Sequence, residues 1–142
     1  MAQVDFYTGA TDRLLIACRL CAKATQQGLK TVVHVPDTLL AGQFDKLLWT
    51  FSQTSFVPHC RVDDRLADIT PVLLNSESAL AKEISSDVLL NLDKAVPADF
   101  ERFQRIVEVV DETVNNKQLA RERYRFYQEQ GHEIRHHRLD ES

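Results

Sequence analysis

Two arginines, Arg121 and Arg125, stand one turn apart in a segment whose spacing predicts a helix from about Thr113 to Gln130. Guanidinium groups can bind a carboxylate through two parallel hydrogen bonds, and a tyrosine ring can wall a pocket for an apolar side chain. This combination predicts a site for a short acidic peptide that ends in a hydrophobic residue. The alternative is a solvated face with internal ion pairs, such as Glu122 with Arg125. The candidate face consists of Gln118, Arg121, Arg125 and Gln128, with Tyr124 on its flank.

The only tryptophan, Trp49, falls on the back of a helix predicted from about Asp37 to Phe51. It lies about 155° from the centre of the apolar stripe along that helix. Phe56 follows in the turn after the helix. Exposed aromatic residues of this kind are typical of a protein interface, whereas a covering loop or helix would bury the indole, and both interpretations stay open. The apolar stripe consists of Leu40, Phe44, Leu47, Leu48 and Phe51.

The turn after the first predicted strand lacks a phosphate-binding motif. Residues 8–12 contain one glycine and no lysine, and they match neither GxGxxG nor GxxxxGK[ST]. Cys18 and Cys21 form a CxxC pattern, but both lie inside a predicted helix on its apolar face, which favours buried hydrophobic residues over a redox pair. A zinc site would need two further ligands, and Cys60 is the only other cysteine.

Three histidines, His132, His136 and His137, follow the last predicted helix. A spacing of four could place two of them around a metal on one helical face, but Gly131 precedes them in a polar segment, and the sequence assigns them no role. No hydrolase or metalloprotease pattern occurs elsewhere. The sequence therefore predicts no catalytic residues, no metal and no cofactor.

The length of 142 residues, with 44% hydrophobic and 27% charged residues, predicts one globular domain with its own core. The segment from Lys117 to Arg138 carries six Lys or Arg and three Glu, a balance of +3, which leaves −7 for the rest of a chain of net charge −4. This asymmetry predicts a local anion site. No apolar run approaches the roughly 20 residues that span a bilayer, and the amino terminus lacks signal-peptide character, so we expect a cytoplasmic protein without membrane contact.

Alternating short apolar runs and amphipathic segments predict an α/β fold, a three-layer α/β/α sandwich with a mainly parallel sheet. We expect one domain over residues 1–131 and a polar, frayed tail over 132–142. The expected helices run from Thr11 or Asp12 to Gly28, from Asp37 to Phe51, from Pro97 to Phe103 and from Thr113 to Gln130. The expected strands are Val4–Tyr7, Thr31–Val35, Pro71–Leu74, Val88–Leu92 and Ile106–Val110. An acidic, loop-like stretch is expected around Asp63, Asp64 and Asp68.

Three segments together carry a resemblance to a known family. They are Phe6-Tyr7, Leu48-Trp49 followed by Ser55-Phe56-Val57-Pro58-His59, and Lys117-Gln118-Leu119-Ala120-Arg121-Glu122-Arg123-Tyr124. In order and spacing the chain resembles the chi subunit family of bacterial DNA polymerase III over nearly its whole length, with little likeness over residues 60–86. The resemblance implies a Rossmann-like fold and a non-catalytic accessory subunit of the polymerase holoenzyme, acting in DNA replication in the bacterial cytoplasm.

The resemblance also implies partners. Chi-like proteins bind the psi subunit of the clamp loader and the acidic carboxyl-terminal tail of single-stranded DNA-binding protein. Trp49 and Phe56 match the aromatic residues that face psi, or a helicase that competes with psi for the same surface. Arg121, Tyr124 and Arg125 match the tail-binding helix, and Arg125 keeps the positive charge of the lysine usual at that position.

Two functions of other classes remain as alternatives. A nucleotide-binding enzyme on the same fold would use residues 9–12 as a phosphate cradle. Direct binding of single-stranded nucleic acid by the basic helix would use Tyr124 and Tyr127 as stacking platforms. The absent motifs disfavour the first, and the overall acidity and mixed charge of the helix predict weak or absent direct contact with DNA.

Overall fold

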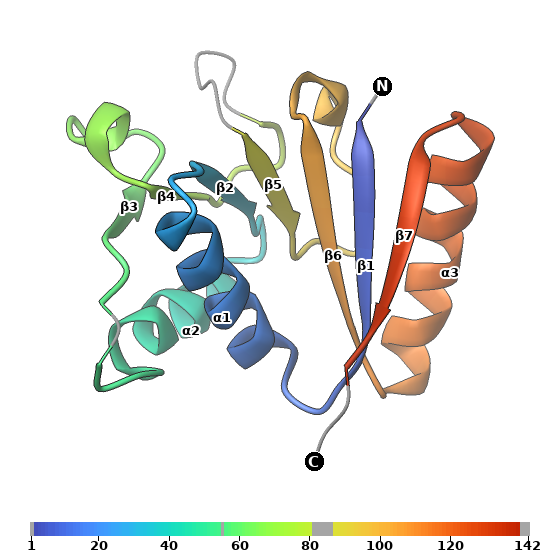
Figure 1. Ribbon diagram of the computed structural model, residues 1–142, viewed down its shortest axis with the longest axis horizontal. Coiled ribbons are helices and arrows are strands. Elements are labelled where there is room, and N and C mark those ends of the chain that lie inside the picture. The colour runs from blue at the N-terminus through green and yellow to red at the C-terminus, as the bar shows by residue number, and fades with distance from the viewer. Residues whose placement is uncertain (1, 55, 81–86, 140–142) are drawn as a thin grey trace.

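A seven-stranded sheet in the order β3-β4-β2-β5-β6-β1-β7 forms the centre of the computed structural model, which describes residues 2–54, 56–80 and 87–139 (Figure 1). Every strand pair is parallel, so the predicted α/β class and mainly parallel sheet are confirmed. The strands are β1 (Gln3–Ala10), β2 (Thr31–His34), β3 (His59–Arg61), β4 (Val72–Asn75), β5 (Val88–Asn91), β6 (Arg105–Asp111) and β7 (Glu133–Arg138). The helices are α1 (Arg13–Gln26), α2 (Thr38–Thr50) and α3 (Val114–Glu129), with 3-10 turns η1 (Ala67–Ile69) and η2 (Phe100–Arg102).

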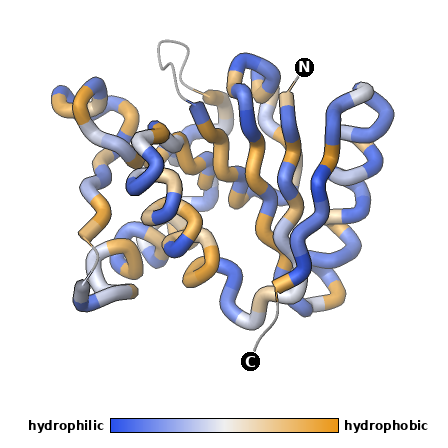
Figure 2. Tube along the Cα trace, in the orientation of Figure 1, coloured by the Kyte–Doolittle hydropathy of each residue, from blue (hydrophilic) through white to orange (hydrophobic). Residues whose placement is uncertain are grey.

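The sheet separates two hydrophobic cores, one on each face. Phe44 and Leu48 of α2 join the first core, whereas Ala120 and Tyr127 of α3 join the second. The chain moves from β1 through α1 to β2 in one direction across the sheet and from β6 through α3 to β7 in the other. Because such crossovers are right-handed, the reversal places α3 on the opposite face from α1 and α2. Figure 2 shows apolar residues concentrated in the central strands and polar residues along α3.

Each long helix begins at a side chain that accepts hydrogen bonds from its first turn. The carboxylate of Asp12 accepts from the backbone N–H of Leu15 at 3.2 Å, and Asp37 accepts from Leu39 at 3.0 Å. Thr113 plays the same role for α3. These contacts satisfy donors that have no partner within the helix. The aspartate caps stand where the sequence predicts the first two helices to start.

The segment beyond Gly131 is not the frayed tail that the sequence predicts. Residues 133–138 form strand β7, paired in parallel with β1 from Gln3↔Glu133 to Thr8↔Arg138. Ile134 packs against the second core while the charged residues around it face solvent. An edge strand tolerates such polar composition because much of its surface stays exposed, so its sequence lacks the apolar run that reveals a central strand.

Two further elements differ from expectation. The helix predicted from Pro97 to Phe103 is a single 3-10 turn, because Asp99 has φ 64°, in the left-handed region that an α-helix cannot include. Strand β3 was not predicted: it lies just before the acidic stretch around Asp63, and its three residues are too few for a period-two pattern to reveal.

The CxxC cysteines are buried and unpaired, as predicted. Burial raises the pKa of the Cys18 thiol to about 12 and also raises the pKa of Cys21. Both thiols are therefore protonated at neutral pH and act as small apolar side chains. Within the described ranges no group of three or more His, Cys, Asp or Glu side chains could hold a metal ion, and no helix there is long and apolar enough to cross a membrane.

His34, at the end of β2, is a buried histidine whose protonation opposes folding. Its side chain is fully buried, and its Nδ1 accepts a hydrogen bond from Asn75 Nδ2 at 3.1 Å. Asp93 Oδ2 lies 3.7 Å from Nε2 and offsets only part of the cost of desolvation. Burial lowers the pKa of His34.

We therefore expect acid to destabilise the fold through His34. The unfolded histidine binds a proton near pH 6.5 and the folded one only at lower pH, so the stabilisation is complete above pH 6.5 and is lost as pH falls below it. His34→Gln, which cannot be protonated, will flatten the pH dependence of the unfolding free energy by up to about 1.4 kcal/mol per pH unit below 6.5. Urea titrations at a series of pH values test this, and an unchanged slope would contradict it.

Candidate functional site

A groove of about 350 Å³ runs between α3 and the carboxyl ends of β1 and β7. Its floor is largely apolar and its walls are largely charged. Strand β7, near the end of the chain, pairs with β1, near its start, so the groove brings together side chains from both ends of the chain. We call it the α3–β7 groove. It is lined by Phe6, Thr8, Gly9, Val110, Asp111, Glu112, Lys117, Ala120, Arg121, Tyr124, His136 and Arg138.

Tyr124 is the aromatic wall of the α3–β7 groove. Its ring packs on Phe6 of β1 with 5.3 Å between centroids, which fixes its orientation. The Tyr124 side chain is still 40% exposed, whereas Phe6 is buried. A half-exposed ring over a buried one offers an apolar surface to a ligand side chain without reorganisation of the protein.

The basic side chains of the groove differ in their partners. Lys117 Nζ lies 2.8 Å from Glu112 Oε2, so this cation is already paired. Arg121 and Arg138 are exposed and form no ion pair among the described residues. Asp111 accepts hydrogen bonds from the start of α3, including 2.9 Å from Asn116 Nδ2. Lys117 and Glu112 therefore neutralise each other, while Asp111 keeps its negative charge at that end of the groove. Arg121 and Arg138 carry the positive charge that is not paired among the described residues.

The predicted polar face of α3 divides between the groove and open solvent. Arg121 and Tyr124 line the groove, whereas Gln118, Arg125 and Gln128 are exposed outside it. At about 100° per residue, Arg125 lies about 40° from Arg121 on the side opposite Tyr124. The ion pair considered between Glu122 and Arg125 does not occur among the described residues.

Of the twelve residues that line the groove, only Arg121 and Tyr124 were predicted for this site. Lys117 could have been found, because Lys117, Arg121 and Tyr124 are spaced four and three apart and share one helical face. Phe6, His136 and Arg138 carry no such signal, because their place in the groove depends on the pairing of β1 with β7. His132 is buried and takes no part in the groove.

A second exposed feature lies at the other edge of the sheet. Trp49 and Phe56 are 58% and 63% exposed, and their ring centroids are 5.5 Å apart. The ring of His59, on β3, lies 4.9 Å from Trp49, and its Nε2 is 3.0 Å from Asp45 Oδ1. The His59 side chain is only 1% exposed, so it supports the two exposed rings from below. We call Trp49 and Phe56, with the buried ring of His59 packed against Trp49, the aromatic patch. The structure thus decides the open question in favour of an exposed indole.

The structure disfavours both alternative functions. Tyr127 is fully buried and donates a hydrogen bond to Glu108 Oε2 at 2.7 Å, so the prediction that it could stack on a base is wrong. The backbone of Leu139 lies against Gly9, where an added Cβ would be 3.2 Å from the Leu139 carbonyl oxygen. The backbone of Leu139 therefore occupies space beside the turn that a nucleotide-binding enzyme would use as a phosphate cradle.

Comparison with known proteins decides the family. The family model described as "DNA polymerase III chi subunit, HolC" matches residues 1–135. The chain belongs to the DNA polymerase III chi subunit family. It is 34% identical to DNA polymerase III subunit chi of Pseudomonas aeruginosa over 143 aligned residues, with 98% of each chain covered. It is 32% identical to the Escherichia coli subunit chi, with 82% of this chain and 78% of that one covered.

The family match extends over both candidate features apart from the end of β7. Trp49, Phe56, Arg121 and Tyr124 all lie within the matched range, whereas His136 and Arg138 lie beyond residue 135. The chi relatives are subunits of a polymerase, which agrees with an accessory protein of DNA replication.

Proposed function

We propose that this chi-family chain is a non-catalytic adaptor that joins the clamp loader, through psi, to the acidic carboxyl-terminal tail of single-stranded DNA-binding protein. The observation that supports this most directly is the α3–β7 groove, where Arg121, which has no ion pair within residues 2–54, 56–80 and 87–139, stands beside the half-exposed ring of Tyr124. Such a groove suits a peptide that ends in an apolar residue with a free carboxylate.

The proposed contacts follow from the groove's chemistry. The last apolar side chain of the tail packs on Tyr124 and Phe6, and its carboxylate accepts hydrogen bonds from the guanidinium of Arg121. Because side chain and carboxylate belong to one residue, their partners must lie side by side. Arg121 and Tyr124, spaced by three on α3, meet that requirement.

The aromatic patch is the proposed psi site. Large exposed aromatic side chains that touch one another supply much of the binding energy at protein interfaces. A helicase that uses the same patch would compete with psi, because both partners would need Trp49.

The two features lie at opposite edges of the sheet, so both partners can bind together. The patch adjoins β3 and the groove adjoins β7. These are the two edge strands of the sheet (Figure 1). Six strand spacings of about 4.8 Å separate these edges by about 29 Å. Many tails on a coated strand would raise the effective concentration at the groove and strengthen a weak individual contact.

We expect Trp49→Ala or Phe56→Ala to weaken psi binding at least about 30-fold, because each removes a ring of an interface centre. Tail-peptide affinity will stay unchanged, since the groove lies at the far edge of the sheet. Leu39→Ala is the matched control, because Leu39 is 72% exposed on the same helix but about 15 Å from Trp49 along its axis. Loss of both activities would indicate misfolding, and unaltered psi binding would overturn the proposed psi site.

A direct titration separates the proposed function from its alternatives. The purified chain is titrated by calorimetry with an acidic peptide that ends in phenylalanine, with a bare single-stranded oligonucleotide and with a nucleotide. We expect that only the peptide binds, and that salt weakens its binding because the contact is charged and exposed. Absence of peptide binding, or affinity only for the oligonucleotide, would overturn the adaptor role.

A further inference from the structure

Strand β7 supplies a second basic wall to the α3–β7 groove, opposite α3. His136 and Arg138 line the groove, and alternate residues of a strand share one face. Ile134, two positions earlier, packs into the α3-side core, which confirms the orientation of that face. Arg135 does not line the groove, and His137, on the other face, stacks on Tyr7 with 4.5 Å between centroids.

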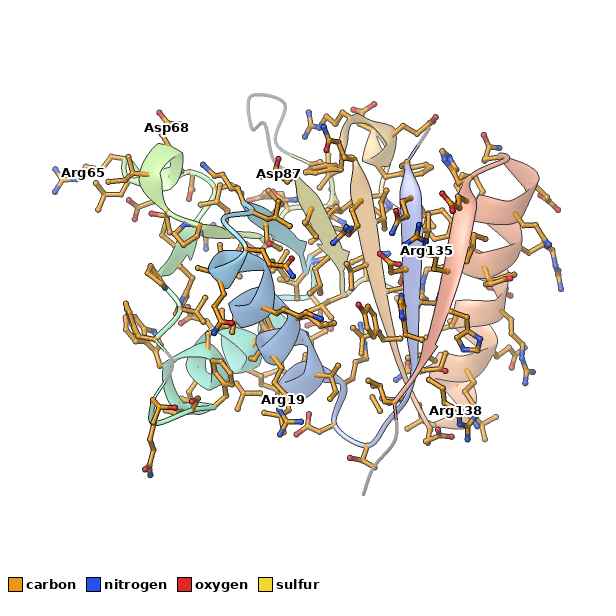
Figure 3. The ribbon with its side chains drawn as sticks, viewed as in Figure 1. Arg19, Arg65, Asp68, Asp87, Arg135 and Arg138 are labelled. Carbon is orange, nitrogen blue, oxygen red and sulfur yellow. The ribbon has the colours of Figure 1, made fainter. Side chains whose placement is uncertain are left out.

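The wall is held in place by its contacts with β1. Thr8 is the register partner of Arg138, and Phe6 is the partner of His136. The Nε2 of His136 lies 2.7 Å from Thr8 Oγ1, a hydrogen bond that fixes the ring beside the groove. Arg138 therefore projects from a strand whose backbone is fixed by parallel pairing, at the carboxyl end of β7 (Figure 3).

Arg138 is available to a ligand. It is exposed and has no ion pair among the described residues, whereas Arg135 on the same strand lies 3.7 Å from Glu133 Oε1. The groove cations without an ion pair in the described part of the chain are thus Arg121 on one wall and Arg138 on the other, with the apolar floor between them. Two guanidiniums on facing walls, neither paired with a described carboxylate, favour a ligand with more than one carboxylate.

We propose that Arg138 binds an acidic side chain of the same peptide whose terminal carboxylate binds Arg121, which makes the groove a two-sided clamp for a peptide that is acidic along its length. This inference rests on the proposed function, because it assigns Arg121 to the end of the peptide. It adds a specificity role for β7, which lies partly outside the residues that the family model matches.

The test compares Arg138→Ala with Arg135→Ala by calorimetry. The probe is a peptide with aspartates before a terminal phenylalanine and a free carboxylate. Arg138→Ala will weaken binding about fivefold, the upper range for one exposed ion pair, and reduce the salt dependence. Arg135→Ala removes the same charge from the same strand outside the groove, so it measures the long-range effect of charge alone, and it will weaken binding less than Arg138→Ala.

A second peptide assigns the contact. When the aspartates are replaced by asparagines, Arg138→Ala will have no further effect, whereas Arg121→Ala will still weaken binding. If Arg138→Ala loses affinity equally for both peptides, or loses none for the acidic peptide, the role of Arg138 is overturned. The adaptor function still stands in that case if Arg121→Ala weakens binding. Absence of binding by the unaltered chain would instead overturn the proposed function. Thermal melts verify that each variant is folded.

Discussion

Replacing Glu108 with leucine will destabilise the fold by about 3–5 kcal/mol, the cost of leaving a buried charge without its partner. Glu108, on β6, is fully buried and its Oε1 lies 2.9 Å from Nε of Arg123, which is also buried. Its Oε2 accepts hydrogen bonds from Tyr127 at 2.7 Å and from Asn91 at 3.0 Å. Burial, and then Glu108, raises the pKa of Tyr127, so its phenol stays a donor. The single substitution therefore leaves three buried side chains, Arg123, Tyr127 and Asn91, without the carboxylate that they bind.

Denaturant unfolding at neutral pH measures this effect. The double variant Glu108→Leu with Arg123→Met will recover part of the lost stability, because no buried charge is then unpaired. Arg125→Ala is the matched control two positions along α3, and as an exposed residue it will change stability by less than about 0.5 kcal/mol. A loss below about 1 kcal/mol for Glu108→Leu would show that the ion pair contributes little.

This buried network also positions the candidate groove. Arg123 reaches Glu108 on β6 and the Lys94 carbonyl after β5, so it fixes α3 over the sheet. Arg121 precedes Arg123 by two residues and therefore points about 160° away, toward the groove. The buried contacts of Arg123 on the inner face of α3 therefore fix the position of Arg121 on the face toward the groove.

Arg121→Ala will weaken binding of an acidic, phenylalanine-ending peptide at least about 30-fold, equivalent to a loss of about 2 kcal/mol at an interface centre. Arg121 lines the groove with Tyr124 and has no ion-pair partner among the residues that the structure describes, and its removal leaves the peptide carboxylate without a fork of donors. The fold will be unaffected because the side chain is exposed.

Calorimetry at low and moderate salt measures the change. Arg125→Ala will weaken binding only about threefold, since this arginine lies outside the groove and acts through long-range charge. If Arg121→Ala binds the peptide as tightly as the unaltered chain, the groove is not the tail site. If Arg125→Ala has the larger effect, the peptide lies on the solvent face of α3.

Local interactions in the sequence determined much of this fold. Asp12 and Asp37 mark helix starts because a cap acts within three residues, and the position of Trp49 on its helix follows from a fixed angle per residue. Central strands are buried on both faces, so their apolar runs predict them. The fixed angle per helical residue also identifies Arg121 and Tyr124, three positions apart on α3, as neighbours.

Only the tertiary structure decided which polar residues face a ligand and which are buried. Arg123 and Arg125 are similar in sequence context, yet one pairs with Glu108 inside the protein and the other is exposed. Strand β7 has no apolar run of its own, and it exists because β1 offers it a free edge. Arg138 reaches the groove only through that pairing. Contacts between residues more than a hundred positions apart depend on the whole sheet, and no local pattern encodes them.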